Sequence, residues 1–197
     1  MNRNILIITG DGGESYEALY AYHRFLEEGD KPVIAAPSKR MLNLVIHDFE
    51  PGWDTYIERK GYAMEADLTF EEIAVEGYEA IVLLGGRAPE YLRNNRKLLS
   101  IVQEFHNSGK WVFAICHGVQ ILVTAGLAQG KCMTAYEHVR AEIEMGGGKY
   151  ETAQAVRDKN IVTAQTWQSH PEFYREVFAC LNQKETPTER EVARAGY

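Results

Sequence analysis

The sequence predicts an α/β fold in which a mostly parallel sheet is covered by helices on both faces. Short apolar runs rich in β-branched residues alternate along the chain with segments of helical periodicity, and this order is typical of a parallel sheet. The runs are continuously apolar, as expected for strands buried on both faces. We expect a single domain over residues 1–182, because the 197-residue chain has no internal repeat and no linker, and a polar tail over 183–197.

The first expected element is a buried strand over residues 5–9, followed by a helix. Apolar and aromatic residues recur at helical spacing between positions 16 and 26, and Gly29 ends this helix as a C-cap. The segment 42–62 carries alternation and turn residues, which predict a small antiparallel excursion. The other strands are expected over residues 32–36, 80–84, 111–115 and 160–164, and the other helices over 98–105, 120–125 and 170–181.

Composition excludes several classes of function. The net charge is −7 and no basic cluster is present, so we expect no nucleic-acid binding. No apolar run approaches 18 residues and the start is a poor secretion signal, so we expect neither a membrane span nor export. Three cysteines without motif spacing indicate reduced thiols in a cytoplasmic protein. The absence of CxxC and HExxH patterns predicts no metal site.

Unusual residues follow three of the predicted strands. These are "GDGGESYE" after Thr9, "GGRAPE" after Leu84 and "CHG" after Ile115. Ligands of open α/β sheets bind at the carboxyl ends of the strands. The three segments therefore predict one site at this edge of the sheet.

Cys116 lies where a strand is expected to turn sharply into a helix. This is the setting of a nucleophile elbow, although "AICHG" keeps only the second glycine of the usual G-x-S-x-G form, at Gly118. Free N–H groups at the helix start favour a thiolate, which is the nucleophilic form. The alternative is a small buried cysteine that only packs.

The neighbouring residues supply candidates for acid–base chemistry. His117 is either a catalytic imidazole that needs an orienting acceptor or a surface histidine at a helix start. Glu14 and Glu17 are either helix-start acids or pocket groups whose pKa is raised by burial beside a thiol. Glu90 is an ordinary helix-start acid or the orienter of His117. Gly85 and Gly86 could present N–H groups as an oxyanion hole.

Other candidates carry less weight. Tyr136, Trp167 and His170 follow expected strand ends and could line the pocket, although aromatic residues there are as often core or interface. His47 and Asp48 lie near the mouth of the site or only pack. The remaining histidines are expected at the surface on helices: His23, His106 and His138.

The motifs together resemble the ThiJ/PfpI superfamily. "GGRAPE", "AICHG" followed by "QIL", and a Glu just after the first strand carry this resemblance over residues 4–181. "IHDFE", "TYIERKGY", "TAY" and "W..HPEF" are most similar to the plant-type glyoxalase III branch. The superfamily includes intracellular proteases of the PfpI type and the Parkinson-associated deglycase. The resemblance implies a flavodoxin-like three-layer sandwich with a nucleophile elbow.

The resemblance also implies roles for four residues. Cys116 matches the nucleophile, His117 matches the catalytic histidine, and Glu17 matches the acid that hydrogen-bonds the nucleophile. Glu90 matches an acid that reaches His117 across a subunit interface. The site would then be complete only in a homo-oligomer, either a dimer or a trimer or hexamer.

Three departures from the superfamily pattern accompany the resemblance. Gly12 and Gly13 replace bulky residues, which would widen or soften the pocket wall, and Val119 stands where Pro or Gln is usual. The plant relatives carry two such domains in tandem, whereas one is expected here.

We expect a cofactor-independent cysteine enzyme acting on small reactive carbonyls. The leading reaction is the conversion of methylglyoxal to lactate, and the deglycation of proteins or nucleotides is a related one. An intracellular peptidase with a Cys116–His117–Glu90 triad is the alternative enzyme. A redox or stress-response sensor, or a chaperone, is the alternative without turnover, since a reachable low-pKa thiol oxidises readily.

Overall fold

A seven-stranded sheet forms the centre of the molecule, in the order β10-β11-β7-β6-β1-β2-β5. The computed structural model describes residues 2–183, so the predicted polar tail lies outside the described residues apart from Gln183. All neighbouring strands are parallel except β10, which runs antiparallel to β11 at one edge. The strands are β1 (Asn4–Ile8), β2 (Lys31–Ala36), β5 (Leu68–Thr69), β6 (Ala80–Leu83), β7 (Trp111–Ile115), β10 (Ala155–Asp158) and β11 (Ile161–Ala164).

Helices cover both faces of this sheet and complete three layers. Ring contacts join α1 to α6 on one face, where Tyr20 packs on Tyr174. On the other face α3 and α4 contact each other and β7. The helices are α1 (Ser15–Glu27), α2 (Ala88–Leu92), α3 (Arg96–Asn107), α4 (Val119–Thr124), α5 (Arg140–Met145) and α6 (His170–Leu181). The predicted flavodoxin-like α/β architecture is confirmed.

The four central strands bury almost every side chain. Strands β6, β7 and β11 are buried along their length apart from Trp111, and β1 is buried after Asn4. A strand that is covered on both faces needs apolar residues at every position. The continuous apolar runs in the sequence are therefore the direct consequence of the two helical layers.

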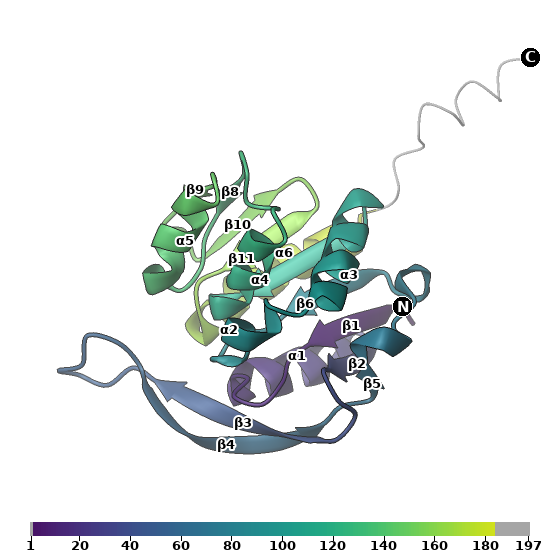
Figure 1. Ribbon diagram of the computed structural model, residues 1–197, viewed down its shortest axis with the longest axis horizontal. Coiled ribbons are helices and arrows are strands. Elements are labelled where there is room, and N and C mark those ends of the chain that lie inside the picture. Colours follow the sequence, from purple (N-terminus) through teal and green to yellow (C-terminus); the bar gives the residue numbers. More distant parts are fainter. Residues whose placement is uncertain (1, 184–197) are drawn as a thin grey trace, which may run out of the picture.

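A long antiparallel hairpin extends from the body as a curved arm (Figure 1). It consists of β3 (Met41–Asp48) and β4 (Ile57–Glu65), with a register shift between Asn43 and Val45. Its base is held over the first strand end, because the Val45 N–H donates to the Gly13 carbonyl at 2.9 Å. The predicted antiparallel excursion over 42–62 is confirmed, and it brings the hairpin beside the edge where the candidate residues gather.

Several short elements were not predicted. Strands β8 (Cys132–Met133) and β9 (Lys149–Tyr150) form a separate two-stranded sheet, and β5 has only two residues. Two residues are too few to show periodicity, and β10 is a half-exposed edge strand without an apolar run. No helix among residues 2–183 combines the length and the apolarity needed to cross a membrane.

Candidate active site

Cys116 lies on the predicted strand-to-helix turn. It follows β7 directly and opens a short 3-10 helix, Cys116–Gly118, that leads into α4. Its φ of 57° is in the left-handed region, which costs a residue with a Cβ about 1–2 kcal/mol. A Cβ at Gly118 would collide with the Leu83 carbonyl oxygen of β6. The second glycine of the elbow is therefore required for the turn to pack against the neighbouring strand.

Glu17 and Gly85 enclose the thiol. Glu17 is fully buried on α1, and its Oε2 accepts a hydrogen bond of 2.6 Å from the Gly85 N–H. A Cβ added at Gly85 would lie 3.1 Å from the Cys116 Sγ and 2.9 Å from the same Glu17 oxygen. Only a glycine at this position lets the carboxyl and the thiol share one small space.

Burial controls the protonation of this pair. Burial and the Glu14 charge raise the pKa of Glu17 well above its usual range. Burial and the Glu17 charge likewise raise the pKa of Cys116, although hydrogen bonds from the His117 and Gly86 backbone N–H groups oppose the rise. The helix start therefore does not by itself produce the thiolate expected from sequence. A protonated Glu17 removes the repulsion and offers an O–H to the thiolate, so the pair is suited to hold one negative charge.

Gly86 completes the wall beside the thiol. Its φ is 76°, and a Cβ there would collide with the Gly12 carbonyl and the Glu14 N–H. Its own N–H and that of His117 approach Sγ. The Gly85 N–H is bonded to Glu17 instead, and the oxyanion hole stays a prediction. Gly12 and Gly13 form a tight turn that packs on Arg87 and Thr9 rather than a widened pocket wall.

Glu14 caps helix α1. Its Oε2 accepts a hydrogen bond of 2.6 Å from the Glu17 N–H, and its Oε1 accepts one of 3.4 Å from the His47 N–H. Burial raises its pKa to about 6. Both oxygens are therefore engaged in holding the backbone around the site, which is the capping interpretation of this residue.

His117 packs beside the thiol in an aromatic surrounding. Its Nδ1 lies 3.4 Å from the Cys116 Sγ, and its ring is 5.7 Å from Tyr56 and 5.2 Å from Tyr136. Burial lowers its pKa to about 4. The adjacent thiol and imidazole do contact each other, which sequence adjacency alone did not establish.

Glu90 does not meet His117 within the chain. It is exposed on α2, and its carboxylate has no hydrogen bond or ion pair to another residue of the described range 2–183. The prediction that it acts on a neighbouring chain's His117 stays a prediction.

Tyr136 contacts the His117 ring, whereas Trp167 is attached to this region through the His47 backbone. Besides its contact with His117, Tyr136 shares a hydrogen bond of 2.8 Å between its hydroxyl and Thr55. Trp167 donates from Nε1 to the His47 carbonyl at 2.9 Å. A hollow of about 400 Å³ opens beside them, lined by Phe49, Tyr136, Glu137, Tyr150, Thr152, Gln154, Gln165, Thr166 and Gln168.

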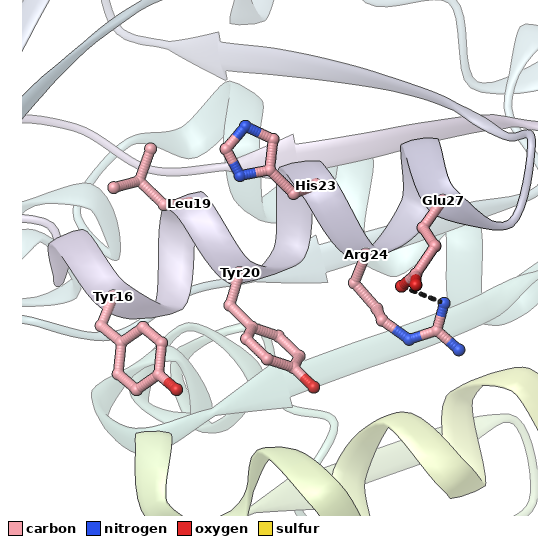
Figure 2. Close-up of a pocket in the computed structure, with 6 residues that line it drawn as sticks. All are labelled: Tyr16, Leu19, Tyr20, His23, Arg24 and Glu27. Carbon is pink, nitrogen blue, oxygen red and sulfur yellow. Dashed lines mark hydrogen bonds and ion pairs between the residues drawn. The ribbon is translucent and has the colours of Figure 1, made fainter.

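His170 belongs to a different part of the molecule. Its buried ring stacks on Tyr20 at 4.4 Å and contacts Tyr16 and Tyr174, between α1 and α6. Figure 2 shows the outer side of α1 here, where Tyr16 and Tyr20 project over a hollow of about 390 Å³ that does not include Cys116. The structure therefore places His170 in an aromatic cluster rather than against the thiol.

The hairpin brings a group of residues that sequence reasoning had left out or given little weight. His47 stacks on Tyr56 at 3.8 Å and lies edge-on to His117 at 6.4 Å. Glu58 accepts from His47 at 3.2 Å and from Arg87 at 3.0 Å. "IHDFE", "TYIERKGY" and "GGRAPE" contain His47, Glu58 and Arg87, but only the register of the hairpin shows that His47 and Glu58 meet.

A family model and several known proteins match this chain. A model of the DJ-1/PfpI family matches residues 3–179. Protein DJ-1 homolog D of Arabidopsis thaliana is 38% identical over 187 residues, which cover 91% of this chain and 48% of that protein. A deglycase of Pyrococcus horikoshii is 37% identical over 161 residues, which cover 82% of this chain and 89% of that protein.

The match therefore spans about half the length of the plant relative and most of the archaeal one. Among solved structures, a ThiJ/PfpI domain protein from Brachyspira murdochii superposes with a TM-score of 0.78 at 21% identity. That superposition covers 92% of this chain and 97% of the other, and it supports the fold.

Proposed function

Because the chain belongs to the DJ-1/PfpI family, we propose that it is a cysteine-dependent enzyme of the deglycase type that acts on small reactive carbonyls. One observation carries the proposal: the Cys116 thiol lies on a strained turn with His117 Nδ1 at 3.4 Å and a buried carboxyl beside it. The name of the archaeal relative supports the reaction class. The finer proposal is that a 2-oxoaldehyde such as methylglyoxal is converted to its 2-hydroxy acid.

The reaction begins with the addition of Cys116 to the aldehyde carbon. The C–S bond forms as the C=O bond becomes a hydroxyl, and the thiol proton passes through His117 Nδ1 to that oxygen. A protonated Glu17 hydrogen-bonds the thiolate before attack and keeps it from being repelled by a second charge. The Gly86 N–H lies where it can stabilise charge next to the reacting atoms.

The resulting hemithioacetal then rearranges. A base removes the hydrogen from the first carbon, which was the aldehyde carbon, and returns it to the second carbon, which is the ketone carbon. Glu17 and His117 are the candidates for this base. The thioester that remains is hydrolysed by water, which releases the hydroxy acid and restores the thiol. No electron acceptor is needed, because one carbon is oxidised as its neighbour is reduced.

Burial of the site favours small substrates over polypeptides. Only 5% of Cys116 and 7% of His117 is exposed. A peptidase would need room for extended chain on both sides of the thiol, so the peptidase alternative has less support. The raised pKa of Cys116 also weighs against a sensor whose thiol reacts readily with peroxide without a substrate.

We propose further that the site is completed by a second copy of the chain. Glu90 is exposed, and its carboxylate is available to a neighbouring molecule's His117. An acceptor for the ring would hold the imidazole in one tautomer, as an orienting carboxylate does in other acid–base pairs.

Conversion of methylglyoxal to lactate without glutathione tests the proposed function. Cys116→Ser is expected to lose activity by at least about 10³-fold, because a hydroxyl is a far weaker nucleophile than a thiolate. Cys132→Ser is the matched control, since that half-buried cysteine lies outside the site. Wild-type protein that yields neither lactate nor free amine from a methylglyoxal-treated peptide would contradict the proposal.

A further inference from the structure

His47 is a buried histidine that the proposed reaction does not use. It lies on β3, and only 2% of it is exposed. Its backbone N–H donates to Glu14 and its carbonyl accepts from Trp167. The ring stacks on Tyr56 and lies edge-on to His117. His47 is therefore attached to the residues after β1, β7 and β11 at once.

Its ring is oriented by a charged partner. Glu58 is the residue directly opposite His47 in the hairpin register, and its Oε2 lies 3.2 Å from Nε2. Both oxygens of Glu58 also accept from the Arg87 Nε at 3.0 Å. Although partial burial opposes it, the hydrogen bonds with His47 and Arg87 lower the pKa of Glu58, so this carboxyl is ionised at neutral pH.

An ionised carboxylate only accepts hydrogen bonds, so it selects one tautomer of the neutral ring. Nε2 carries the hydrogen and donates to Glu58, which leaves Nδ1 with a free lone pair. That Nδ1 is buried and has no hydrogen-bond partner among the described residues. A buried acceptor without a donor costs free energy unless a ligand satisfies it. The arrangement is that of a general base and its orienter.

We propose that His47 is a second catalytic residue of this active site, which moves a proton between the two oxygens of the substrate. This inference rests on the proposed function, because it concerns the rearrangement of the Cys116 hemithioacetal. During that step the hydroxyl on the first carbon must lose its proton as a thioester carbonyl forms. The ketone oxygen on the second carbon must gain one as it becomes a hydroxyl. Nδ1 accepts the first proton and delivers it to the second oxygen.

The two proton transfers then balance. One base moves the hydrogen from the first carbon to the second, and His47 moves the hydroxyl proton from the first oxygen to the second. No proton is left over, and water enters only to hydrolyse the thioester. His47 and His117 are both buried from solvent, so an internal carrier replaces the solvent in the second transfer.

Several charged and titratable groups surround His47 and shape its pH response. Burial lowers its pKa, and the interaction with Glu58 opposes this effect. We expect the kcat profile to fall on the acid side, as the ring becomes protonated and Nδ1 can no longer accept. Tyr56, Glu58 and His117 contact the ring, Glu14 accepts from the His47 backbone N–H, and the charges of Arg87 and Glu90 act on the ring electrostatically.

His47→Gln tests the proposal, because the glutamine amide can still donate to Glu58 at the Nε2 position but cannot carry a proton. We expect kcat for methylglyoxal to fall about 10²-fold with KM within threefold, and the acid limb attributed to His47 to disappear. With [¹³C]methylglyoxal, the hemithioacetal on Cys116 should accumulate, since the addition step is untouched. Glu58→Gln is the second variant and should lose about tenfold, because an amide does not enforce the tautomer.

Glu65→Gln is the matched control for Glu58→Gln, since Glu65 lies on the same strand as Glu58 and is exposed at the far end of β4. The ¹⁵N spectrum of His47 supplies a readout that does not depend on turnover. It should show hydrogen on Nε2 and none on Nδ1 at pH 7. Hydrogen on Nδ1, or a His47→Gln enzyme with kcat within twofold of an active wild type, would overturn the inference. A wild type that makes no lactate would instead contradict the finer proposal, the conversion of methylglyoxal to its hydroxy acid, on which this inference rests.

Discussion

Two of the three buried histidines among the described residues, His117 and His170, both lie in aromatic clusters but differ in what their nitrogens contact. His117 is surrounded by Tyr56, Tyr136 and His47, and His170 by Tyr16, Tyr20 and Tyr174. Burial lowers the pKa of each ring to about 4. The difference lies in what the nitrogens meet: His117 Nδ1 contacts a thiol at 3.4 Å, whereas neither nitrogen of His170 has a hydrogen-bond partner among the described residues.

Burial and a lowered pKa therefore do not separate the histidine of the proposed site from one that only packs. Both are consequences of packing an imidazole among aromatic rings, which penalises the charged form of the ring in either cluster. A thiol at 3.4 Å, and backbone donors aimed at that thiol, distinguish the His117 cluster. The topology supplies these, since the turns after β6 and β7 meet the start of α1 at one sheet edge.

The largest expected difference between the clusters is catalytic. His117→Gln should lower kcat for methylglyoxal by about 10²–10⁴-fold, because the proton carrier next to the thiol is lost. His170→Gln should leave kcat within twofold, since that ring does not contact the site. Steady-state lactate formation measures both variants under the same conditions.

Thermal unfolding of the two variants serves as their control, because a loss of kcat must not come from a loss of fold. A His170→Gln enzyme that lost tenfold or more in kcat while staying folded would show that the two clusters are coupled. In that case the contacts of the ring nitrogens of His117 and His170 would not explain which histidine matters for turnover.

The second difference concerns the free energy of unfolding at acidic pH. Burial holds the pKa of His170 at about 4, below its ordinary value of 6.5. Between pH 4 and 6.5 the unfolded state therefore binds more protons than the folded state. The free energy of unfolding falls as the pH falls from 6.5 towards 4. His170→Phe removes the titrating ring and should be more stable than wild type by about 2 kcal/mol at pH 5. The gain should be smaller at pH 7, and urea unfolding at the two pH values measures it.

Equal gains at pH 5 and pH 7 would contradict the linkage argument and point to packing alone. His23→Phe is the matched control, since it makes the same substitution at an exposed position of α1.

Much of the fold could be predicted from the sequence, because strands that are buried on both faces of the sheet need continuous apolar runs. The predicted strands 111–115 and 32–36 fall within β7 and β2, and the predicted helix 170–181 is α6. Elements of two residues, such as β5 and β8, carry no period and were not predicted. Edge strand β10 was not predicted because one of its sides lacks a covering layer.

The site was predictable where topology alone determines it. Cys116, Glu17 and Gly85 follow strand ends of one sheet, so their meeting follows from the strand order. The contact of His47 with Glu58 depends instead on hairpin register, and a slip of one residue would place Arg59 opposite the ring. His170 follows a strand end as well, but the turn of α6 directs its ring to the far side of α1.

The smallest expected difference concerns the hydroxyl groups of the two clusters. Tyr136 shares a hydrogen bond of 2.8 Å with Thr55, whereas the Tyr20 hydroxyl has no hydrogen-bond partner among residues 2–183, and the Tyr20 ring packs on His170. Tyr136→Phe should therefore cost about 1 kcal/mol in the free energy of unfolding, and Tyr20→Phe should cost less than about 0.5 kcal/mol. Both keep the aromatic ring, so kcat should stay within threefold in each. Urea midpoints at pH 7 measure the stability, and a larger cost for Tyr20→Phe would show that the His170 cluster contains a polar contact after all.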